Sequence, residues 1–131
     1  MYENYMLLNR GFQNVKQNNQ IIGFQVFAKI AYYRGIFLPL IGDFEITVDG
    51  EKFTAMQMNF KVGHHTYSFD ELAQAEDVHW DFGKPLTIIV LKPGGLKPGV
   101  HDITLVQTIK PSYTGEQGRT STVTKKMSIV I

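Results

Sequence analysis

Strict alternation of apolar and polar residues is the feature that most constrains how this chain can fold. Residues 44–48 alternate between the two types and end at Asp49-Gly50. Successive side chains of a strand point to opposite faces, so a period of two places the apolar residues on one face. Asp-Gly favours a tight hairpin, because both central residues of that turn need a positive φ. The sequence therefore predicts an antiparallel hairpin around residue 50.

The same alternation recurs along the whole chain. The expected strands cover about 5–15 (with a bulge at Gly11), 22–32, 44–48, 53–62 (with a bulge or break between Phe53 and Met56), 86–91, 101–109 and 122–131, and residues 36–40 are a short apolar segment. Val, Ile and Thr outnumber Ala and Leu by more than two to one, and branching at Cβ suits a pleated surface. The capping-box pattern of residues 68–71 predicts one short helical turn in the middle of the chain. We therefore expect an all-β protein, an antiparallel β-sandwich of the immunoglobulin or fibronectin kind, forming one domain over residues 1–131.

Composition excludes several classes of protein. The 131 residues contain no cysteine, which excludes a disulfide scaffold and a cysteine-ligated zinc site. A net charge of +1 gives no electrostatic argument for binding nucleic acid or an anionic membrane. The chain shows neither a signal-peptide pattern at its start nor an apolar run that could span a bilayer. We expect a cytoplasmic protein.

Catalytic motifs are scarce. The chain lacks a G-x-S-x-G elbow, a phosphate loop and a dinucleotide-binding fingerprint. His64, His65 and His79 suggest a metal site, but adjacent histidines in a strand point to opposite faces, and hydrogen-bonded surface histidines explain them more simply. The acidic residues 71–81 could supply a carboxylate pair, although a solvated loop is the simpler interpretation. We assign no catalytic residue and no metal ligand to this chain.

Aromatic residues and arginine provide the stronger signal, because these types are enriched where proteins anchor on one another. The residues that we predict to contact a partner or border a pocket are Tyr32, Tyr33, Arg34, His65, Tyr67, Trp80 and Tyr113. Aromatic faces also stack on sugar rings, and ordinary core packing is the alternative for each residue, most of all for Trp80. As a group they indicate a binding surface.

Several short motifs, taken in order, resemble one known family. They are residues 11–15 (GFxNV), 23–26 (GFQV), 32–35 (YYRG), 48–51 (VDGE), 66–72 (TYxFDEL), 80–83 (WxFG) and 95–101 (GLxxGxH). No motif is specific alone, but their order and spacing over nearly the whole chain resemble the small β subunit of bacterial C-glycoside deglycosidases. The resemblance suggests a non-catalytic subunit in a hetero-oligomer.

What the resemblance implies about chemistry concerns the partner. In that family a larger α subunit, a xylose-isomerase-like (β/α)8 barrel, holds a divalent metal, typically manganese, and a histidine acid/base. The substrate is a 3-oxo C-glucoside of a flavonoid or similar phenol, whose C1–aryl bond breaks by elimination, a carbon–carbon lyase reaction. We thus expect no cofactor in this chain and rank an accessory subunit first. A stand-alone carbohydrate-binding sandwich ranks second, and a small metal-dependent enzyme using His64, His65 and His79 ranks third.

Overall fold

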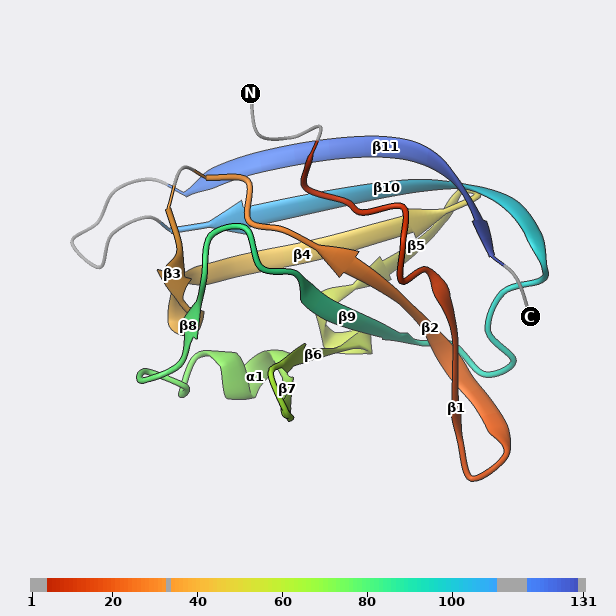
Figure 1. Ribbon diagram of the computed structural model, residues 1–131, viewed down its shortest axis with the longest axis horizontal. Helices are drawn as coiled ribbons and strands as arrows, with labels where there is room; N and C mark the ends of the chain where they lie inside the picture. The colour runs from red at the N-terminus through yellow and green to blue at the C-terminus, as the bar shows by residue number, and fades with distance from the viewer. Residues whose placement is uncertain (1–4, 33, 111–117, 130–131) are drawn as a thin grey trace.

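Two large antiparallel sheets form most of the described structure, a computed structural model that covers residues 5–32, 34–110 and 118–129 (Figure 1). The first sheet has the spatial order β1 (Gln13–Gln17), β2 (Gln20–Ala28), β9 (Leu86–Leu91), β6 (Met58–Val62) and β7 (His65–Ser68). The second has the order β11 (Arg119–Ile129), β10 (Gly99–Ile109), β4 (Ile41–Val48) and β5 (Glu51–Thr54). A small two-stranded sheet pairs β3 (Ile36–Phe37) with β8 (His79–Trp80). The predicted all-β, antiparallel, sandwich-like class is confirmed.

The core lies between the two large sheets. The rings of Phe24 on β2 and Phe53 on β5 are 5.5 Å apart between centroids. The same separation joins Phe44 on β4 to Phe60 on β6. Each pair takes one strand from each sheet, and all four rings belong to one contiguous cluster of buried residues. The sheets therefore pack face to face, as the alternation of the strands requires.

Turn chemistry explains two tight hairpins, the predicted one around residue 50 and another between β1 and β2. Asp49 and Gly50, which join β4 to β5, have φ of 49° and 89°. Asn18 and Asn19, between β1 and β2, have φ of 52° and 65°. Asn, Asp and Gly tolerate this left-handed region better than other residues, so both hairpins close tightly.

The predicted break after Phe53 has a larger consequence than a bulge. A 3-10 turn over Ala55–Gln57 separates β5 from β6 and carries the chain from the four-stranded to the five-stranded sheet. The side-chain Oε1 of Gln57 accepts a hydrogen bond from the Thr54 N–H at 3.0 Å, which caps this turn. The phase change in the sequence marks the point where the chain changes sheet.

The helical turn predicted in the middle of the chain is confirmed as α1 (Phe69–Leu72). Glu71 Oε1 accepts from the Ser68 N–H at 2.8 Å, and Ser68 Oγ accepts from the Glu71 N–H at 3.3 Å. This reciprocal capping box holds a helix of one turn, whose Leu72 side chain is buried against the core.

The expected strand over residues 5–15 is wrong. Strand β1 starts only at Gln13, and before it Leu7 makes an isolated bridge to Ala28. Gly11, with φ of 82°, lies so close to the Phe27 ring that a Cβ there would be 2.5 Å from it. The chain therefore turns around the Phe27 ring, which interrupts the edge strand.

The expected long strand over residues 22–32 ends early, because β2 stops at Ala28. The next backbone groups bond to a side chain instead of a strand: Gln107 Oε1 accepts from the Ala31 N–H at 2.9 Å, and Gln107 Nε2 donates to the Lys29 carbonyl at 3.1 Å. Ile30 and Tyr32 are nevertheless buried, as the alternation suggested.

Candidate protein-interaction site

Aromatic and arginine side chains gather at one end of the sandwich, around the small β3–β8 sheet. We call this group the aromatic end and define it as Tyr32, Arg34, Phe37, His79, Phe82 and Arg119. Pairing of β3 with β8 places Phe37 opposite His79, with ring centroids 4.9 Å apart in an edge-on arrangement. Gly35 permits this approach, because a Cβ there would lie 2.4 Å from His79 Cε1.

Two arginines converge on one buried tyrosine in this group. The guanidinium carbons of Arg34 and Arg119 lie 5.9 and 5.2 Å from the centroid of the Tyr32 ring. Tyr32 is 5% exposed, whereas both arginines are exposed. Arg119 starts β11, so strand pairing brings a residue from late in the chain beside the 32–37 segment (Figure 1). The ring supports two cationic groups at the surface through cation–π contacts.

Trp80 lies beneath this end of the molecule rather than on its surface. Its side chain is 2% exposed, its ring packs near Phe44, and its Nε1 donates to the Lys84 carbonyl at 2.9 Å. The packing role that the sequence left open for Trp80 is the one that its environment supports. Beside it Phe37 and Phe82 are 41% and 51% exposed, and they supply the apolar surface.

A histidine–aspartate pair lies at the edge of the aromatic end. His79 Nδ1 and Asp81 Oδ1 are 2.7 Å apart. This hydrogen bond is the main cause that lowers the pKa of Asp81 below its ordinary value, and Lys84 adds a weaker attraction. A cavity of about 240 Å³ lies behind the pair, between β8 and the β6–β7 turn. In the described ranges no group of three or more His, Asp or Glu side chains is placed to hold a metal ion.

The residues predicted from the sequence fall in two places. Tyr32, Arg34 and Trp80 meet at the aromatic end, whereas His65 and Tyr67 lie on β7, at an edge of the five-stranded sheet. His65 is exposed and Tyr67 is half-buried against the core. Tyr33 and Tyr113 lie outside the described residues. Contact of these residues with a partner stays a prediction.

The predicted contact residues include only Tyr32 and Arg34 of the aromatic end, so sequence reasoning missed Phe37, His79, Phe82 and Arg119 as contact residues. Phe37 belongs to an apolar run, and its only signal is alternation, which points it away from buried Ile36 and Leu38. Arg119 carries no local signal, because its place depends on the register in which it faces Ile109.

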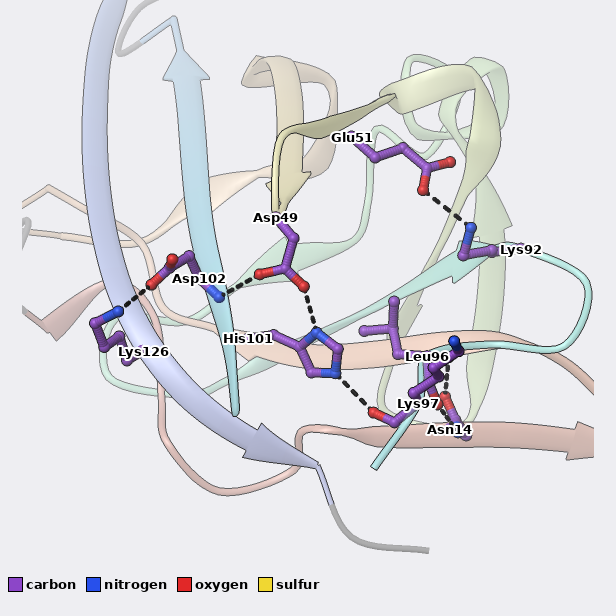
Figure 2. A network of polar contacts seen from close by, with 9 residues as sticks. All are labelled: Asn14, Asp49, Glu51, Lys92, Leu96, Lys97, His101, Asp102 and Lys126. Carbon is purple, nitrogen blue, oxygen red and sulfur yellow. Dashed lines mark hydrogen bonds and ion pairs between the residues drawn. The ribbon is translucent and has the colours of Figure 1, made fainter. Parts of the chain in front are cut away.

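A second polar arrangement, centred on His101, lies at the opposite end of β10 (Figure 2). His101 Nδ1 is 2.6 Å from Asp49 Oδ2, and His101 Nε2 is 2.7 Å from the Lys97 carbonyl oxygen. The other carboxylate oxygen of Asp49 accepts from the Asp102 N–H at 2.8 Å. Both ring nitrogens of His101 thus face acceptors, so the doubly protonated ring is the form that fits.

The titration of this network follows from its geometry. The hydrogen bond to the Lys97 carbonyl is the main cause that raises the pKa of His101, and the Asp49 carboxylate adds to it. The hydrogen bond that His101 donates to the Asp49 carboxylate is the main cause that lowers the pKa of Asp49. The ion pair ties the β4–β5 turn to β10 and to the loop before it. Its arrangement is that of a structural clamp.

Comparison with known proteins agrees with the order of motifs in the sequence. The family described as "C-glycoside deglycosidase beta subunit" matches residues 2–113. A protein of that name from Eubacterium cellulosolvens is 36% identical over 102 residues, which are 77% of this chain and 69% of the relative. The chain belongs to the C-glycoside deglycosidase beta subunit family. The matched range of this deglycosidase subunit family includes β1 to β10 and the aromatic end except Arg119, so the resemblance inferred from the motifs is confirmed.

Among the described residues no helix is long and apolar enough to cross a membrane.

Proposed function

We propose that this chain is the non-catalytic β subunit of a heteromeric C-glycoside deglycosidase. The observation that carries the proposal is the family match over residues 2–113. In this role the sandwich stabilises a catalytic α subunit and borders its substrate pocket.

The bond-breaking chemistry belongs to the α subunit in this proposal. The substrate is a 3-oxo C-glucoside, in which the C3 ketone acidifies the hydrogen on C2. Loss of that proton lets the C1–aryl bond break by elimination, and the aryl carbon takes up a proton. A divalent metal held by the α-subunit barrel, for which manganese is our choice, would stabilise the enolate charge, and a histidine there would move the proton.

The aromatic end is our proposed contact surface for the α subunit. Phe37 and Phe82 are exposed rings of this group, and the side chains of Arg34 and Arg119 are exposed as well. Aromatic residues and arginine are the types that dominate binding energy at protein interfaces, where a ring is buried and a guanidinium finds acceptors. The buried Trp80 and Tyr32 beneath them hold the backbone that presents this surface.

Co-expression with the α subunit tests the proposal. We expect the two chains to co-elute in size exclusion and to cleave a 3-oxo C-glucoside, whereas the β chain alone leaves it intact. Phe37→Ser should lower the yield of complex, while Met56→Ser, at a residue 66% exposed elsewhere, should not. Cleavage by the β chain alone, or failure of the chains to associate, would overturn the proposal.

A carbohydrate-binding sandwich is the second candidate, favoured by the exposed rings of Phe37 and Phe82. Rings exposed in this way can stack on sugar faces. This function requires the isolated chain to bind free glucosides in calorimetry, and Phe82→Ser should then abolish the heat of binding.

A further inference from the structure

A groove lies at the end of the sandwich opposite to the aromatic end. Its volume is about 860 Å³, and it lies between the edge strand β1 and the loop that precedes β10. We call it the basic groove, and the residues that define it are Asn14, Lys16, Ile21, Pro93, Leu96 and Lys97. Neither the aromatic end nor the proposed chemistry of the α subunit uses these residues.

The wall of the basic groove is held in place by hydrogen bonds. Asn14 Nδ2 donates to the Leu96 carbonyl, and Asn14 Oδ1 accepts from the Leu96 N–H, both at 2.9 Å (Figure 2). The Gly94 N–H donates to the Ile21 carbonyl at 3.0 Å. At the next residue His101 holds the carbonyl of Lys97. The loop is therefore pre-organised, which reduces the entropy lost when a ligand binds.

The basic groove carries positive charge. Among the described residues that line it, Lys16 and Lys97 carry charge and none is acidic. Within the described residues neither ammonium group forms an ion pair. By contrast, nearby Lys92 pairs with Glu51 at 3.0 Å. A ligand that complements this groove carries negative charge.

The shape of the basic groove suits an extended chain. Strand β1 is the outermost strand of its sheet, so among the described strands only β2 pairs with it. An edge strand offers free N–H and C=O groups to an added segment, and Ile21, Leu96 and Pro93 provide apolar contacts. The 11 residues of β10 separate this groove from the aromatic end, roughly 35 Å apart.

We propose that the basic groove binds an extended, acidic segment of the partner subunit. The segment runs beside β1, its carboxylates meet Lys16 and Lys97, and its apolar side chains lie against Ile21 and Leu96. The inference rests on the proposed function for the identity of the partner.

The test uses the complex of full-length α and β chains. The double variant Lys16→Gln/Lys97→Gln should bind the α subunit about tenfold or more weakly at low salt, with its melting temperature kept. It should also lose much of the salt dependence that wild-type binding shows. The matched control, Lys52→Gln/Lys126→Gln, removes two lysines from the four-stranded sheet and should bind as wild type does.

A zero-length carbodiimide cross-link gives an independent measurement, because it joins a lysine amine only to a carboxylate in contact with it. We expect Lys16 and Lys97 to cross-link to acidic residues within one short stretch of the α subunit. Equal affinities for both double variants, or cross-links from these lysines only to a second copy of this chain, would overturn the inference. In both cases the wild-type complex still forms, whereas a failure of the proposed function shows no complex at all.

Discussion

Gln107 offers the sharpest test of how the end of β2 is held against the second sheet. It is the fully buried polar side chain of the described core, at 1% exposure, and it lies on β10. Its amide satisfies one N–H and one carbonyl of the segment 29–31, which leaves the five-stranded sheet just before Tyr32. We predict that Gln107→Leu, which keeps the bulk and removes both hydrogen bonds, destabilises the protein strongly.

The magnitude follows from the two groups left without a partner. A buried unsatisfied N–H or carbonyl costs about 1–3 kcal/mol, and the added apolar contact of leucine offsets about 1 kcal/mol. Because Lys29 and Ala31 are half-buried, we expect a loss of about 2–4 kcal/mol in the free energy of unfolding. For a chain of this length that corresponds to a melting temperature lower by roughly 10 °C.

The assay is urea and thermal unfolding of the variant beside Gln17→Leu, at an exposed glutamine of β1, as the matched control. Gln107→Glu adds a second test, because a carboxylate repels the Lys29 carbonyl but a protonated carboxyl can donate to it. Burial raises the pKa of such a glutamate, so its deficit should shrink as the pH falls from 7.5 to 4.5. A Gln107→Leu protein as stable as Gln17→Leu would refute the reasoning.

Three further outcomes are expected. Because the pKa of His101 is raised, its ion pair with Asp49 stabilises the protein fully below the ordinary histidine pKa, and this stabilisation is lost as the pH rises through the raised value. The urea midpoint of the wild type should therefore decrease as the pH is raised from 6 to 8.5, and that of His101→Gln should decrease less. Gly95→Ala should destabilise more than Gly94→Ala in urea unfolding, because both have positive φ but only Gly95 would place its Cβ 2.3 Å from a side-chain oxygen; equal losses would contradict this. Trp80→Phe should lower the free energy of unfolding by about 2–3 kcal/mol through a lost hydrogen bond and a cavity, and an unchanged melting temperature would show that the indole is dispensable.

Local chemistry explains which elements could be predicted from the sequence. The Asp49-Gly50 hairpin and the capping box of α1 are each specified within four residues, so the local sequence is enough to predict them. The predicted strand over residues 86–91 matches β9, because a strand between β2 and β6 needs apolar residues on both faces. These elements define the sheets and the direction of the chain at each turn.

Long-range contacts explain what could not be predicted. Strand β2 stops at Ala28 because an amide almost eighty residues later satisfies the backbone that follows it. In the same way the Asn14 side chain fixes the backbone of Leu96. At the aromatic end the sequence supplied Tyr32 and Arg34 but not Arg119, which joins them only through the β10–β11 register.

The order in which the chain visits the two sheets has a consequence for biosynthesis. It lays down β1 and β2 in one sheet, β4 and β5 in the other, returns for β6, β7 and β9, and finishes with β10 and β11. The central strands β9 and β10 arrive late, so the sheet edges of an emerging polypeptide stay open until most of it has left the ribosome. Sheets with such non-local strand pairing form slowly, and their unpaired strand edges stay exposed and prone to aggregation until pairing is complete. During this interval, binding of the unpaired edges by a chaperone or by a folded partner chain would favour assembly over aggregation.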